Sequence, residues 1–140
     1  NFRLSNGEIN PECDIILEGY GATMSEMNSY IGLKQMEDID SLFYTQKLNA
    51  KRWDAVMELR ENVVSININK NCEPNYWIYG VLAENKANFI KEMRDNNYYA
   101  TGVHINNNIY SIFNNKIDLS GVNDFMNKFV ALPCGWWFNR

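Results

Sequence analysis

The single histidine of the chain, His104, is the side chain best suited to polar chemistry near neutral pH. One imidazole cannot form a histidine-rich metal site, and the cysteines Cys13, Cys72 and Cys134 all lie far from it in the sequence. Their odd number and wide spacing favour buried or incidental thiols in a reducing compartment over a disulfide scaffold or a zinc site. Composition alone favours a structural or surface role for His104, because catalysis would need partners that its spacing does not identify.

A second candidate is the glycine bend at residues 19–21, with sequence GYG, followed by Thr23. Backbone N–H groups at the start of a helix attract anions, because the unpaired donors and the helix dipole both favour negative charge. The same residues could simply begin a helix, since Thr23 and Glu26 have the spacing of a capping box and Ser25 is an alternative cap. For Gly21 and Thr23, a phosphate-binding edge and a capped helix both remain open.

Composition excludes several other kinds of site. The sequence has no phosphate-binding P-loop, no Gly-x-Gly-x-x-Gly run and no Gly-x-Ser-x-Gly elbow. With 140 residues, 46% hydrophobic residues and a net charge of −4, the chain is expected to be one globular, cytoplasmic domain. Its negative net charge does not favour binding to nucleic acid or to an anionic membrane, and its apolar runs are too short for membrane insertion. The chain has 22 asparagines, so the triplet at residues 106–108 is weak evidence for a polar site.

Hydrophobic periodicity predicts the elements that position these residues. Apolar residues recur at helical spacing from residue 24 to about residue 60, and the pattern continues through Gly32. The period then changes to two at Val64, Ile66 and Ile68, which predicts a strand. The remaining pattern predicts strands at residues 76–83 and 98–104, helices at 85–96 and 120–128, and an end of regular structure at 130–133. This order predicts an α+β fold: a small antiparallel-type sheet with helices on one face and a long N-terminal helical segment.

Several stretches occur in an order that resembles one family. They are residues 19–33 with Ile39 and Asp40, residues 76–81, residues 88–97, and the Thr-Gly-Val-His signature at 101–104. Together they resemble the DegT/StrS family of aminotransferases and dehydratases, which depend on pyridoxal phosphate (PLP) and act on nucleotide-linked keto sugars. Asn107 and residues 110–113, 132–133 and 135–137 resemble a branch associated with surface-polysaccharide sugars. The resemblance spans about residues 14–138.

The resemblance implies a single domain over residues 1–140 that is the C-terminal small domain of a fold-type I PLP enzyme. Residues 1–60 would be the lead-in segment and long connecting helices, and residues 61–140 the small α+β lobe. The lysine that holds PLP would lie upstream of residue 1, and no lysine here occupies the family's lysine motif. We therefore expect no catalytic residue in this chain, no metal, and no PLP bound to it alone.

The resemblance also implies roles for four residues. Gly21 and Thr23 would reach the cofactor phosphate across a homodimer, although the family usually has larger polar side chains there. His104 and Asn107 would border the nucleotide-sugar site, because imidazole and amide groups can bind sugar and phosphate oxygens. The related branch often has Arg-Asn-Asp at residues 106–108, and its arginine provides a bidentate phosphate contact that asparagine cannot imitate.

The expected parent is a homodimer that moves an amino group from a donor such as glutamate to a nucleotide-linked keto sugar, for lipopolysaccharide or capsule synthesis. Two alternatives remain open from the sequence. One is a related PLP-dependent sugar dehydratase, in which a histidine replaces the upstream lysine. The other is a non-catalytic α+β binding or assembly module.

Overall fold

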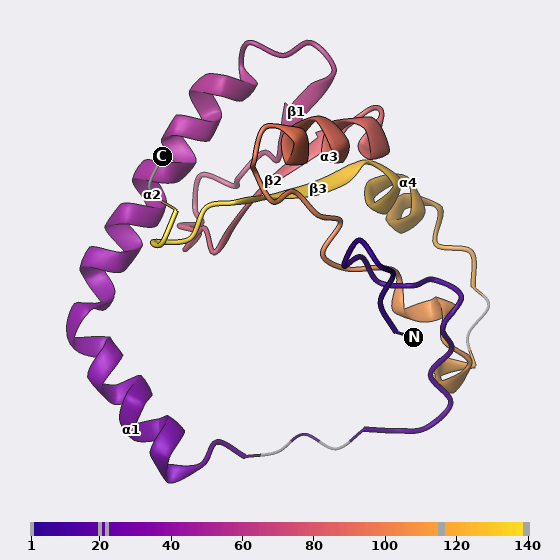
Figure 1. Cartoon of the computed structure of the whole chain (residues 1–140), viewed down its shortest axis with the longest axis horizontal. Helices are drawn as coiled ribbons and strands as arrows, with labels where there is room; N and C mark the ends of the chain where they lie inside the picture. The colour runs from indigo at the N-terminus through magenta and orange to yellow at the C-terminus, as the bar shows by residue number, and fades with distance from the viewer. Residues whose placement is uncertain (1, 20, 22, 115–116, 139–140) are drawn as a thin grey trace.

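The computed structural model describes residues 2–19, 21, 23–114 and 117–138 (Figure 1). Residues 26–57 are helical, and the chain after them combines a small sheet with further helices. The elements are α1 (Glu26–Gln35), η1 (Met36–Asp38), α2 (Ile39–Met57), β1 (Val63–Ser65), β2 (Ile78–Ala83), α3 (Lys86–Asp95), η2 (Asn107–Ile109), η3 (Ser111–Phe113), α4 (Ser120–Lys128) and β3 (Phe129–Pro133).

The elements α1, η1 and α2 form a continuous helical arm that extends away from the sheet (Figure 1). Gly32 lies inside α1, as predicted. The cap of α1 is Ser25, whose side chain accepts a hydrogen bond from the Asn28 N–H at 3.3 Å, so Thr23 is not the capping residue. No residue of α1 is buried. The buried residues of α2 lie in its second half and are Gln46, Asn49, Ala50, Trp53 and Met57.

The three strands form an antiparallel sheet in the order β1-β2-β3. In the central strand β2, burial alternates: Tyr79, Val81 and Ala83 are buried and the residues between them are partly exposed. This alternation is the period of a strand that packs one face on a core. The buried face of β2 therefore needs helices to cover it.

Helices α2 and α3 provide that cover. Trp53 and Met57 of α2, with Phe89 and Met93 of α3, join the buried strand residues in one hydrophobic cluster. Trp53 also donates its indole N–H to the Pro133 carbonyl at 2.8 Å, which ties α2 to the end of β3. The predicted α+β class, with a small antiparallel sheet and a long N-terminal helical segment, is confirmed.

The predicted strand at residues 98–104 is wrong. These residues form only an isolated bridge between Thr101 and Ala131, and the third strand is instead β3. Val103 has a φ of +58°, which is incompatible with an extended strand. The predicted strand at residues 76–83 starts later, at Ile78, because Tyr76 has a φ of +54°.

The burial phase of β1 also differs from its apolar pattern. Val63 is buried, whereas Val64, one of the predicted apolar set, is 63% exposed. Val63 pairs with Ala83 in register, so it lies on the core face of the sheet, and Val64 lies on the other face. Within the described part of the chain, each helix is either too short or too polar to traverse a bilayer.

Candidate functional site

The turn that carries His104 is closed by local hydrogen bonds. The His104 N–H donates to the Gly102 carbonyl at 2.7 Å, and the Val103 N–H donates to the Thr101 hydroxyl at 3.1 Å. With Val103 at a φ of +58°, this is the rare, strained form of γ-turn. Thr101 is paired in both directions with Ala131 of β3, so the sheet fixes one end of the turn. His104 follows it with its side chain exposed.

Asn107 lies in a groove where the segment before the glycine bend meets η2 and η3. The Asp14 carboxylate accepts hydrogen bonds from the Ser111 N–H at 2.8 Å and the Ser111 hydroxyl at 2.6 Å. These bonds hold the pKa of Asp14 below its ordinary value. The groove has a volume of about 330 Å³ and is lined by Ile15, Leu17, Glu18, Gly19, Asn107, Tyr110, Ile112 and Phe113. The structure therefore places Asn107 in the same groove as Gly19, at the start of the glycine bend.

The other predicted site residues do not line this groove. Gly21 and Thr23 are exposed, and among the described residues no atom lies within 4 Å of the position that a Cβ on Gly21 would take. His104 precedes Asn107 by three residues and is also absent from the lining. The structure thus associates Asn107 with the glycine-bend segment, and it does not gather all four predicted residues into one pocket.

Two polar atoms beside Asn107 lack partners. The side-chain carbonyl oxygens of Asn106 and Asn108 are buried and accept no hydrogen bond from the residues that the structure describes. The amide nitrogen of Asn106 is used, because it donates to the Asn123 carbonyl oxygen at 2.5 Å. Buried acceptors without a donor are uncommon. The abundance of asparagine hid this feature in the sequence.

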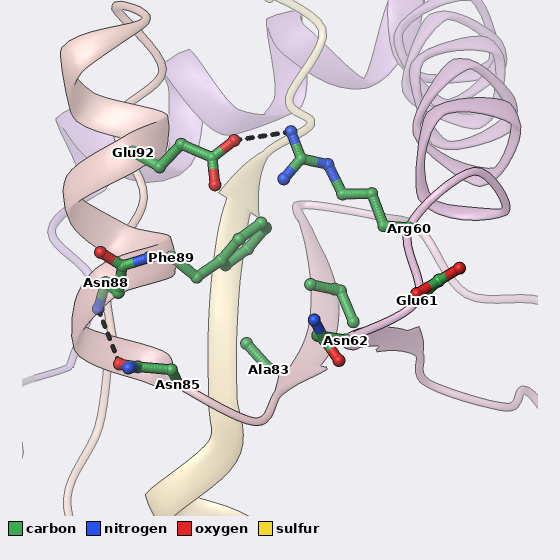
Figure 2. A pocket seen from close by; sticks show the side chains of 9 residues that line it. Arg60, Glu61, Asn62, Ala83, Asn85, Asn88, Phe89 and Glu92 are labelled. Atoms are coloured by element: carbon green, nitrogen blue, oxygen red, sulfur yellow. Dashed lines mark hydrogen bonds and ion pairs between the residues drawn. The ribbon is translucent and has the colours of Figure 1, made fainter.

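A second pocket, of about 350 Å³, lies between the end of α2 and the start of α3 (Figure 2). Arg60 and Glu92 form an ion pair of 2.8 Å across it, and the Arg60 guanidinium lies 5.7 Å from the centre of the Phe89 ring. Their hydrogen bond raises the pKa of Arg60 and lowers that of Glu92. The Asn85 side chain caps α3 by accepting the Asn88 N–H. These polar groups have partners within the pocket, and this arrangement indicates a structural role.

Comparison with known proteins identifies the family. The model of the DegT/DnrJ/EryC1/StrS aminotransferase family matches residues 6–138, so the chain belongs to this family. The family prediction made from the sequence motifs is confirmed. No match is found among curated protein sequences.

Solved structures share the fold. Sugar aminotransferase CalS13 from Micromonospora echinospora superposes with a TM-score of 0.77 at 24% identity, over 87% of this chain and 33% of that one. AtS13 from Actinomadura melliaura gives 0.76 at 23% identity, over 84% and 32%. Helicobacter pylori PseC, an aminotransferase involved in the biosynthesis of pseudoaminic acid, gives 0.71 at 17% identity, over 95% and 36%. The chain spans about a third of the length of these proteins.

Proposed function

We propose that this chain is the C-terminal domain of a PLP-dependent aminotransferase that transfers an amino group to a nucleotide-linked keto sugar. The observation that carries this proposal is the aminotransferase family match over residues 6–138. Two structural relatives, the sugar aminotransferase CalS13 and PseC, an aminotransferase involved in the biosynthesis of pseudoaminic acid, support a sugar as the substrate. A homodimeric, cytoplasmic parent that serves lipopolysaccharide or capsule synthesis is part of the same proposal.

The described residues do not fit PLP by themselves. Gly21 and Thr23 are exposed on a segment without packing partners at Gly21, so they form no cradle for a phosphate. The partly buried Lys86 donates to the Met126 carbonyl at 2.8 Å and lies against Gly102, where burial lowers its pKa. The Lys86 side chain is therefore engaged in contacts within the small lobe, residues 61–140. We assign the cofactor and its lysine to the rest of the parent, with Gly21 and Thr23 as one edge of the site.

Substrate recognition is assigned to the loop around His104 and Asn107. An imidazole donates to sugar or phosphate oxygens, and an asparagine amide both donates and accepts. Residues 106–108 include no arginine, so this loop offers no guanidinium fork for a phosphate. We therefore expect the loop to contact the sugar more than the pyrophosphate.

The complete protein tests this function directly. With PLP, glutamate and a panel of nucleotide-linked keto sugars, we expect an aminated product by mass spectrometry. Asn107→Ala should raise the KM for the sugar nucleotide by about tenfold, as loss of a polar contact does. The exposed Asn67→Ala provides the matched control. Absence of amination across the panel would contradict the proposal.

The chain alone tests the assignment of the cofactor. Mixed with PLP, the 140-residue chain should give no lysine-dependent absorbance band, because no described lysine lies beside Gly21 and Thr23 in a pocket. A band that is lost when a lysine of this chain is replaced would refute that assignment. It would leave the transamination assay of the complete protein unaffected as a separate test.

A further inference from the structure

The strained turn before His104 has one support that comes from far away in the sequence. Four consecutive N–H groups of the turn are satisfied, and those of Thr101, Val103 and His104 use the sheet or the turn itself. The N–H of Gly102 instead donates to the Glu8 carboxylate at 3.1 Å. Glu8 precedes Gly102 by 94 residues. The N-terminal segment therefore supplies the one long-range side-chain hydrogen bond to the backbone of this turn among the described residues.

Glu8 is itself firmly held. Its second oxygen accepts a hydrogen bond from the Arg94 guanidinium at 2.6 Å, and the two side chains are only 23% and 24% exposed. Arg94 also donates to the Ala100 carbonyl at 2.8 Å and lies 5.0 Å from the centre of the Tyr99 ring. The arginine thus braces Glu8 and the chain that enters the turn. Charge-assisted contacts of this kind are shorter and stronger than neutral ones.

The remaining side of Gly102 is also closed. A Cβ on Gly102 would meet the Lys86 ammonium nitrogen at 3.0 Å and the Glu8 carboxylate oxygen at 3.4 Å. Gly102 is buried between these two groups. A β-branched residue with positive φ persists only where its surroundings determine the conformation. Glu8, Arg94 and Lys86 provide such surroundings for the turn at Val103.

We propose that Glu8 is a positioning residue for the His104 turn and, through this turn, for the sugar-nucleotide substrate. The carboxylate bridges Arg94 and the Gly102 N–H, and this bridge maintains the turn that presents His104 and the asparagines after it. The structural part stands on the contacts alone. The substrate part rests on the proposed function.

Amide hydrogen exchange tests the structural part on the chain itself. Glu8→Ala should accelerate exchange at the Gly102 N–H by about tenfold or more, the effect expected when a hydrogen bond to a charged group is lost. Glu8→Gln retains an acceptor oxygen and should restore part of the protection. Glu92 lies on α3, as Arg94 does, and forms a similar ion pair with Arg60. Glu92→Ala breaks that pair and should leave the exchange rate of the Gly102 N–H unchanged. Unchanged exchange at Gly102 in Glu8→Ala would overturn the proposal.

Steady-state kinetics of the complete enzyme test the substrate part. Glu8→Ala should raise the KM for the sugar nucleotide by about fivefold or more and leave the half-reaction with the amino donor unchanged, because the loss is confined to one substrate's binding. Equal effects on both substrates, or none, would overturn the positioning role. An inactive wild-type enzyme would refute the proposed function, and the exchange experiment would still decide the role of Glu8 in the turn. Should Glu8→Ala fail to fold, Glu8→Gln gives the same comparison with a smaller expected change.

Discussion

The amide of Asn49 closes the C-terminal end of the chain onto α2. Its nitrogen donates to the carbonyls of Gly135 at 3.1 Å and Phe138 at 2.8 Å, and the residue is only 1% exposed. We predict that Asn49→Ala lowers the free energy of unfolding by about 1–3 kcal/mol, because the Gly135 and Phe138 carbonyls lose the hydrogen-bond donor that Asn49 provides. Urea denaturation measures this change. The exposed Asn67→Ala should change stability little, and equal losses in both variants would contradict the argument.

The sequence could not identify Asn49 or Glu8 as important residues. Asn49 is one of 22 asparagines, and nothing local distinguishes it from the exposed ones. Glu8 contacts Arg94, which lies 86 residues away, and single-sequence patterns carry no information on such pairs. His104 and Asn107 are predicted site residues because they lie within or beside a family motif. A local motif thus allows a site to be proposed from the sequence, whereas the long-range contacts that support the turn could not be predicted.

At the scale of the element, the start of α1 separates two roles that the sequence left open. Ser25 caps the helix, and Thr23 does not. Ser25→Ala should destabilise the first turn by about 0.5–2 kcal/mol, the usual cost of removing a cap. Because α1 has no buried residue, we expect faster amide exchange at Asn28 with little change in global unfolding. Thr23→Ala should leave the exchange at Asn28 unchanged, and an equal effect of both substitutions would contradict this assignment.

The link between Asp14 and η3 predicts a dependence on pH. Hydrogen bonds from Ser111 lower the pKa of Asp14 below 3.8, so the carboxylate form stabilises the native contact. This stabilisation is present above the unfolded pKa and is lost as the pH falls through the lowered native pKa. We expect the Ser111 amide to lose exchange protection under acid conditions below about pH 4.

Two variants check the origin of that change. Asp14→Asn should show weak protection at Ser111 already at neutral pH and little further change in acid. Asp95→Asn removes an exposed carboxylate that pairs with Lys91 elsewhere on the surface, and it should retain the wild-type profile. If the loss of protection in acid persists in Asp14→Asn, a group other than Asp14 causes it.

Helices were predicted better than strands, for a physical reason. The helical arm has buried residues at helical spacing, Ala50, Trp53 and Met57, so its period was readable. The strand β3 has four consecutive buried residues and no alternation, so its sequence did not show the period of a strand and was interpreted as the end of regular structure. Conversely, residues 98–104 have strand-like composition, but Val103 has a positive φ that long-range contacts stabilise. Tertiary context decided both cases.

At the scale of the whole molecule, α1 forms the part of the helical arm that stands apart from the small lobe, whereas α2 packs against the sheet (Figure 1). The apolar side chains of α1 are at least half exposed; they are Met27, Tyr30, Ile31 and Leu33. Contiguous exposed apolar surface is typical of an interaction site. The chain spans about a third of the length of its structural relatives. We therefore expect the exposed apolar side chains of α1 to contact another protein surface.

This exposed arm predicts that the chain alone self-associates. The average mass in sedimentation velocity should rise with protein concentration, because association buries apolar surface that water otherwise contacts. Ile31→Glu on α1 should shift the distribution towards the monomer. Val122→Glu on α4 is a matched control, since both are β-branched helical residues with similar exposure, 50% and 44%. Equal shifts in the two variants would show that added charge, and not the arm, controls association; a concentration-independent monomer would refute the prediction outright.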